Sequence, residues 1–230
     1  MFEKLPEGIG NALINQRAGM ENVVYNHLHA QRLVGRLNVR SRAFAFNARL
    51  PPQYTADGEG LSPPLAWDDV PGDADSIVLI IEDADSPTPH PLVHAIVVDL
   101  APKDGSLDEG ALNSPDHRGV GLETGRNSFF KRAWLPPDPP CGHGEHRYVF
   151  QVFALRAGAS FSEVPGRREF ITVVLDRAIA VGCLIGTYER SERSAISDGG
   201  GIEAEPTGIL TNSPQGDIEF VCRSRLVRAI

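Results

Sequence analysis

The sequence predicts a mostly-β fold with a small helical component, and three observations support this prediction. Residues 76–81 are almost continuously apolar and rich in β-branched side chains, as is typical of a strand covered on both faces. Residues 94–100 and 147–155 are apolar runs of strand length and predict two further central strands. Eighteen prolines and 23 glycines among 230 residues indicate many turns, which favours a sheet-rich architecture over a helical bundle.

The segments before the central strands predict an N-terminal helical extension, a strand and a long loop. Residues 1–35 form the extension. Its apolar residues at helical spacing are Ile9, Leu13 and Ile14 for one helix, and Val23, Val24 and Leu28 for a second, short helix. Residues 36–46 alternate apolar and polar side chains and predict a strand. Residues 51–64 contain several turn-forming pairs and predict a loop.

The segments after the central strands predict a helix, a closing strand and a tail. Residues 169–181 favour a helix despite their β-branched content, and residues 183–188 favour a strand. Residues 191–230 are rich in serine, glycine and glutamate and predict a partly flexible C-terminal tail. The main domain is therefore expected at residues 36–190.

Composition excludes several classes of function. The formal net charge of -8 argues against nucleic-acid binding, which needs a cationic face. No segment approaches the roughly 20 apolar residues of a membrane helix, so integral membrane association is not expected. The first residues lack the basic head and apolar stretch of a signal peptide, which predicts a cytoplasmic location. The three cysteines suit neither a disulfide framework nor a metal site, although Cys141 could be a reactive thiol.

Titratable residues occur at the ends of the predicted strands in two separate motifs. The first is Asp83-Ala84-Asp85-Ser86-Pro87, followed by His94 at the head of a strand. The second is the glycine- and proline-rich loop from Pro139 to Tyr148, with His146 just before a strand. Either motif alone has a structural explanation, since aspartates before proline cap turns and a lone histidine is usually a satisfied structural residue. Together, the two motifs favour a shared pocket.

The chemistry of this pocket suits a small anion. Asp83 and Asp85 are two apart on an extended chain, so both carboxylates are expected to face one cavity. Pro87 stiffens the chain that follows them. Imidazoles donate hydrogen bonds to phosphate or carboxylate groups, and nearby aspartates orient the rings and favour their charged form. His143 is interpreted as a solvated loop residue without a role.

The two motifs resemble those of the phosphatidylethanolamine-binding protein family, in its bacterial Raf kinase inhibitor-like branch. Supporting similarities are Ser62-Pro63-Pro64-Leu65-Ala66-Trp67 and Gly186-Thr187-Tyr188, so that the resemblance covers residues 44–190. It implies a two-sheet β-sandwich with a few peripheral helices and an anion-binding pocket. It also implies that Pro140, Gly142 and Gly144 line the mouth of the pocket and that Tyr148 contributes its ring or hydroxyl. The chain departs from the pattern at Ala84, Ser86 and Asp138, and at residues 91–93.

The predicted function is non-enzymatic binding of a small anionic ligand, such as a phospholipid headgroup, without a cofactor. No Gly-x-Ser-x-Gly nucleophile motif is present. Two alternatives remain open. Two histidines and two aspartates are also able to hold a metal or shuttle protons in a hydrolase or lyase. The family resemblance suggests instead a regulator that inhibits a kinase or protease, and a homodimer is expected from the same relatives.

Overall fold

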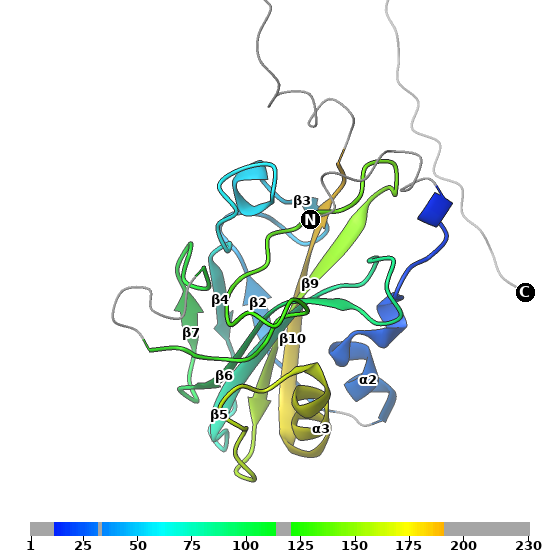
Figure 1. The fold of residues 1–230 in the computed structure, drawn as a ribbon. Helices are drawn as coiled ribbons and strands as arrows, with labels where there is room; N and C mark the ends of the chain where they lie inside the picture. The colour runs from blue at the N-terminus through cyan, green and yellow to red at the C-terminus, as the bar shows by residue number, and fades with distance from the viewer. Residues whose placement is uncertain (1–11, 32–33, 114–120, 191–230) are drawn as a thin grey trace, which may run out of the picture. The chain divides into compact units, whose positions relative to one another are not determined.

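The central element of the structure is a mixed sheet, drawn in Figure 1. The computed structural model describes residues 12–31, 34–113 and 121–190, so the predictions for Ile9 and for the tail at 191–230 lie outside it. In this part of the chain seven strands pair in the order β1 (Gly35–Arg36), β10 (Ala178–Tyr188), β9 (His146–Leu155), β5 (Ser76–Asp83), β6 (Leu92–Leu100) and β8 (Glu123–Thr124), with β3 (Ala48–Arg49) also paired to β10. β1 and β3 run parallel to β10, and the other pairs are antiparallel.

A smaller antiparallel sheet covers one face of the large sheet. Its strands are β2 (Asn38–Arg40), β4 (Leu65–Asp68) and β7 (Gly105–Leu107), in that order. Leu65 and Trp67 of β4 share an apolar cluster with residues from one face of β5, namely Ile77, Leu79 and Ile81. The prediction of a mostly-β fold with two sheets and few helices is confirmed.

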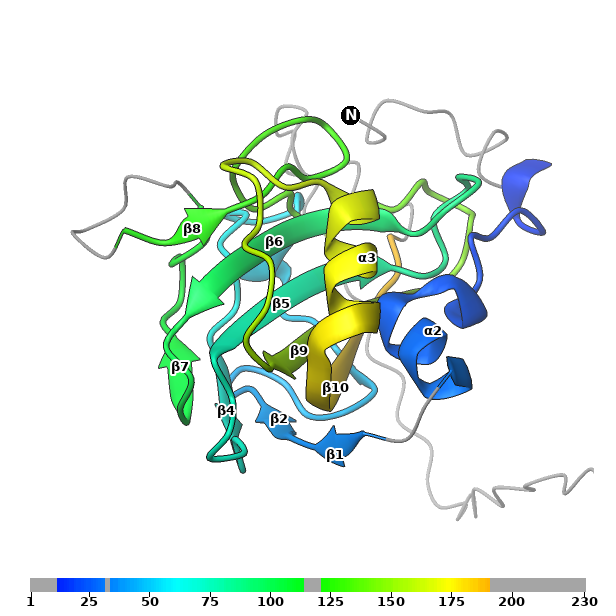
Figure 2. The ribbon, with the colours of Figure 1, turned by 90° about the horizontal axis from the view of Figure 1, so that it is seen from below.

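Two helices pack against the opposite face of the large sheet, as Figure 2 shows. They are α2 (Val24–Gln31) and α3 (Arg167–Arg177). The structure also has two short 3₁₀ helices, η2 (Met20–Asn22) and η3 (Pro52–Tyr54). Alternate residues of a strand face opposite ways, so Val78 and Ile80 of β5 point towards α2 and α3. They share a second cluster with Val24, Leu28, Phe170 and Val174. Every residue of β5 is buried, which confirms the prediction of a strand covered on both faces.

Hydrogen bonds to Glu82 of β5 link both helices to the sheet. Its fully buried carboxylate accepts hydrogen bonds from Nε of Arg167 at 2.6 Å, from Nε2 of Gln151 at 2.8 Å and from the backbone N–H of Val24 at 3.0 Å. A buried carboxylate is stable only when it is paired and hydrogen-bonded in this way. Because Val24 begins α2, the negative charge also lies at the positive end of that helix.

Local boundaries differ from the sequence predictions in two places. The strand expected at 36–46 is divided between β1 and β2 and ends at Arg40. The helix expected at 169–181 ends at Arg177, because from Ala178 onward the backbone pairs with β9 and sheet pairing overrides the local helical pattern. The second N-terminal helix is confirmed as α2. No helix in the described ranges is long and apolar enough to cross a membrane.

Candidate functional site

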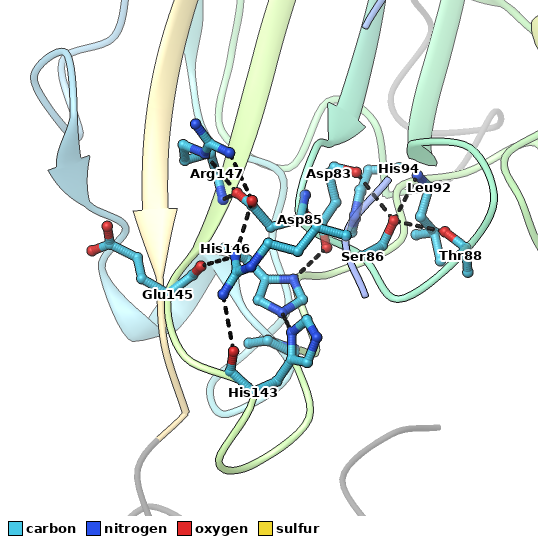
Figure 3. A network of polar contacts seen from close by, with 12 residues as sticks. Asp83, Asp85, Ser86, Thr88, Leu92, His94, His143, Glu145, His146 and Arg147 are labelled. Atoms are coloured by element: carbon cyan, nitrogen blue, oxygen red, sulfur yellow. Dashed lines mark hydrogen bonds and ion pairs between the residues drawn. The ribbon is translucent and has the colours of Figure 1, made fainter. Parts of the chain in front are cut away.

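Strand pairing brings the two sequence motifs together at one edge of the large sheet. The chain leaves β5 at Asp83 and enters β9 at His146, and these strands are antiparallel neighbours. On the other side of β5, β6 carries His94 close to its start. Figure 3 shows Asp83, His94 and His146 at this edge.

A cavity of about 130 Å³ lies between the loops at this edge. Five of the residues singled out in the sequence line it, namely Asp83, Pro87, His94, Pro140 and His146. The remaining lining residues, none of which the sequence motifs predicted as ligand contacts, are Ala56, Ser86, Leu92, Phe129, Leu135, Pro136, Asp138 and Pro139. Apart from Asp138 these residues carry no titratable group, so composition offered no signal for them.

A chain of hydrogen bonds runs from Asp83 through two histidines. Nδ1 of His146 donates to Oδ2 of Asp83 at 2.7 Å, and Nε2 of His146 lies 2.6 Å from Nδ1 of His143. Nε2 of His143 donates to the carbonyl oxygens of Leu13 at 2.8 Å and Gln16 at 3.2 Å. His143 is fully buried, so the interpretation of a solvated loop residue is wrong. The His-x-x-His spacing was visible in the sequence, but the carbonyl partners lie about 130 positions away.

His94 has one ring nitrogen engaged and the other without a partner. Nδ1 lies 2.5 Å from the carbonyl oxygen of Leu135; a carbonyl can only accept, so this nitrogen carries a proton. Nε2 is buried and has no hydrogen-bond partner among the described residues. Burial lowers the pKa of His94, and the nearby Asp83 carboxylate only partly offsets this effect. His94 is therefore neutral near pH 7, with the lone pair of Nε2 free.

Tyr148 lies beside the cavity histidines rather than in the cavity wall. Its ring centroid is 5.2 Å from that of His94 and 6.4 Å from that of His146. Its hydroxyl is also buried without a partner in the described part of the chain. Burial and the nearby Asp83 carboxylate raise the pKa of Tyr148 well above its ordinary value, so the phenol remains a hydrogen-bond donor.

Asp85 serves a different purpose from Asp83. Its carboxylate accepts two hydrogen bonds of 2.7 Å from the Arg147 guanidinium and one of 2.9 Å from the backbone N–H of Arg147, and it pairs with Arg17 at 2.9 Å. β5 ends at Asp83 and a turn follows, so the side-chain alternation of a strand does not extend to Asp85. Only Asp83 lines the cavity, against the expectation that both carboxylates face it.

The glycines of the second motif shape its loop without lining the cavity. Gly142 and Gly144 adopt φ angles of 78° and 86°, which are strained for residues with a side chain. They allow the loop to turn back so that His143 is buried beneath it. Cys141 is buried in the same loop.

An ion-pair network of three charged residues includes one residue of the cavity wall, and the sequence motifs did not predict this network. Arg190, almost fully buried, binds the carboxylates of Asp57 and Asp138. Burial would lower the pKa of Arg190, but hydrogen bonds to the two aspartates raise it above its ordinary value. Arg190 thus forms an ion pair with Asp138 in the cavity wall and shares its single positive charge with Asp57. In the residues that the structure describes, no group of three or more His, Cys, Asp or Glu side chains is arranged to hold a metal ion.

Comparisons with known proteins agree on one family. The family model of the phosphatidylethanolamine-binding protein matches residues 40–189. UPF0098 proteins of Methanothermobacter thermautotrophicus and Aquifex aeolicus are 33% and 35% identical to the chain over 156 residues; the match covers 67% of this chain and 99% and 89% of theirs. These names state no enzymatic activity.

Solved structures show the same fold. The phosphatidylethanolamine-binding protein homologue CT736 of Chlamydia trachomatis is 32% identical, with a TM-score of 0.60 over 68% of this chain and 99% of its own. YbcL of E. coli, described as a member of the mammalian PEBP family, has a TM-score of 0.63 at 23% identity, over 68% and 99% of the two chains.

Proposed function

Since this chain belongs to the phosphatidylethanolamine-binding protein family, we propose that it binds a small anion in the cavity between its two motifs. The ligand carries a phosphate or carboxylate group, as a phospholipid headgroup does, and it is bound without being converted. The lining suits such a ligand, because a few polar groups converge in a wall that is otherwise apolar or proline.

The observation that carries this proposal is the unpartnered Nε2 of His94. A buried polar atom without a hydrogen bond costs about 1–3 kcal/mol, so a ligand that supplies the missing hydrogen bond gains affinity from it. Nε2 belongs to a residue of the cavity wall, and among the described lining residues it is the one buried side-chain atom without a hydrogen-bond partner. An anionic ligand in the cavity would accept a hydrogen bond from Nε2 once His94 is protonated.

Binding is therefore coupled to uptake of a proton. Burial lowers the pKa of His94 in the free protein, whereas a bound anion raises it by favouring the imidazolium. The affinity for an anion should be highest below the pKa of His94 in the free protein and should be lost as pH rises from there through the pKa of the complex. Sulfate keeps a constant charge where histidines titrate, so it separates this effect from titration of the ligand itself.

The test compares two histidine variants by calorimetric titration with inorganic phosphate, phosphoethanolamine and sulfate. In His94→Asn the side-chain amide can still donate to Leu135, but Nε2 is lost. His90→Ala, an exposed histidine on the loop after β5, is the matched control. We expect wild type and His90→Ala to bind alike and His94→Asn to bind at least about tenfold more weakly, the loss of one charge-assisted hydrogen bond.

Two results would count against the anion site. One is an unchanged affinity in His94→Asn, with thermal unfolding showing that the variant is folded. The other is sulfate binding by wild type that does not weaken between about pH 5 and pH 8, the range in which histidines titrate.

Ligand binding at this site would also regulate the binding of a protein partner. We propose that an occupied cavity orders the loops around His146 and Pro140, which then form a contact surface for a kinase or protease. From the sequence alone we also propose a cytoplasmic protein that pairs as a homodimer. Family membership supports these proposals only as precedent, since one fold serves many functions.

A further inference from the structure

The hydrogen bonds around His143 and His146 fix where their protons lie. Nδ1 of His146 faces a carboxylate oxygen of Asp83, and Nε2 of His143 faces the carbonyl oxygens of Leu13 and Gln16. Carboxylates and carbonyls only accept, so both of these outer nitrogens carry protons.

The contact between the two histidine rings therefore needs one more proton, shared by the two nitrogens that face each other. Nε2 of His146 and Nδ1 of His143 lie 2.6 Å apart. In two neutral rings with protonated outer nitrogens, both inner nitrogens would present lone pairs, which repel at this distance. A third proton between them makes the contact a hydrogen bond, so the pair carries one positive charge beside the negative charge of Asp83.

The charge belongs on His146. Burial lowers the pKa of His143, as does the neighbouring His146, so His143 is the neutral acceptor of the pair. The carboxylate of Asp83 lies against the other side of the His146 ring. The further charged or titratable groups around the pair and the cavity include Arg17 from the N-terminal segment, His94 from β6, Tyr148 from β9 and Asp138 from the loop before β9.

This arrangement depends on a segment outside the stretch that matches the family model. Residues 13–19 precede residue 40, where the match begins. Arg17 donates to the carbonyl oxygens of Glu145 at 2.8 Å and His143 at 3.0 Å. The backbone N–H groups of Ala18 and Gly19 donate to the first motif, at Ser86 and Ala84. The segment thus connects both motif loops.

We propose that His143 is a positioning residue that, fixed by the N-terminal segment, holds His146 as an imidazolium directed at Asp83. Both N–H groups of His146 are then committed to Asp83 and His143. The ligand's hydrogen bond therefore falls on His94, while His146 contributes its charge. Only the statement about the ligand's hydrogen bond rests on the proposed anion site. The charge state of His146 is a property of the free protein.

The first measurement is ¹⁵N NMR of the histidine rings in the ligand-free wild type at about pH 7.5, one unit above the ordinary histidine pKa. We expect two protonated nitrogens in His146, and in His143 a protonated Nε2 with an unprotonated Nδ1. A neutral His146 with one unprotonated nitrogen at this pH would overturn the proposal.

Two variants test the role of His143 as the hydrogen-bond acceptor of His146. His143→Gln keeps a hydrogen-bond acceptor and a donor, whereas His143→Leu fills the space without either. In His143→Leu we expect His146 to become neutral at this pH and inorganic phosphate to bind at least about tenfold more weakly, the loss of one charge-assisted interaction. His143→Gln should restore both the imidazolium signature and most of the affinity.

The outcomes separate the two proposals. An imidazolium signature in a wild type that binds no phosphate would overturn the anion site and leave the positioning role of His143 intact. Phosphate binding that is equal in wild type and both folded variants would overturn the positioning role and leave the anion site intact.

Discussion

At the scale of single residues, the site concentrates polar atoms that the fold leaves without partners. Nε2 of His94 and the hydroxyl of Tyr148 are both buried and unpartnered in the described part of the chain, and their rings are in edge contact. The buried carboxylate of Glu82 in β5, by contrast, is paired with three donors. A buried unpaired atom lowers stability, and one in a cavity wall is a place where a ligand can form the missing hydrogen bond.

The Tyr148 hydroxyl provides a prediction that separates an effect on stability from an effect on binding. Tyr148→Phe removes a buried donor that no described residue accepts, so the free energy of unfolding without ligand should rise by about 1 kcal/mol. The affinity for phosphate should change little, because Tyr148 does not line the cavity. Urea unfolding and phosphate titration measure the two effects. A variant that is clearly destabilised without ligand would show that the hydroxyl has a partner in the free protein.

At the scale of elements, the contact of β10 with the N-terminal strands depends on glycine. A Cβ added at Gly182 would lie 2.3 Å from the carbonyl oxygen of Leu37 and 2.7 Å from a methyl group of Val39. The backbone N–H of Leu37 donates to Val181, so the chain between β1 and β2 lies directly on β10. Close packing of this strand therefore requires a residue without a side chain.

Gly182→Ala should accordingly weaken the fold at this contact. We expect a loss of about 1–3 kcal/mol in the free energy of unfolding, typical of an extra methyl group in a packed interior. Gly72→Ala is the matched control, because a Cβ there meets no atom within 4 Å. Urea unfolding of both variants makes the comparison. Equal stability of the two would mean that the β1–β2 segment moves aside freely.

At the scale of the whole molecule, charge pairing within the site loops affects the response to acid. Burial acts to raise the pKa of Asp85, but hydrogen bonds from Arg147 and Arg17 outweigh it and lower the pKa below its ordinary value. A carboxyl with a lower pKa in the folded than in the unfolded chain stabilises the fold above its unfolded pKa. That contribution is lost as pH falls through the folded value.

Asp85→Asn should reduce stability at neutral pH and make unfolding less sensitive to acid. The variant leaves Arg147 without its carboxylate partner, so the difference in unfolding free energy from wild type should be largest near pH 7. It should shrink below about pH 4, where the Asp85 carboxyl of the unfolded wild-type chain begins to take up its proton while the folded one still resists. Urea unfolding across this range gives the comparison. A difference that stayed constant down to strongly acid pH would contradict the contribution of the Asp85 charge.

Part of the site was predictable because its residues mark the ends of strongly patterned strands. Asp83, His94 and His146 stand where the apolar runs begin or end, and antiparallel pairing places such ends together. The position of Asp85 was not predictable in the same way. Its side-chain direction depends on β5 ending two residues earlier, and its partner Arg147 lies 62 positions away.

By itself, the sequence determined the class of fold and the motifs that form the site. A continuous run of β-branched residues can bury both faces only in the middle of a layered structure, and this local pattern is independent of distant partners. The tertiary structure alone decided that His143 is buried, that His146 is bonded at both nitrogens and that residues 13–19 connect the two loops. The physical reason is that most of these contacts join distant positions, 63 apart for His146 with Asp83 and 130 apart for His143 with Leu13, and hydrogen bonds across such separations leave no periodic signal in the sequence.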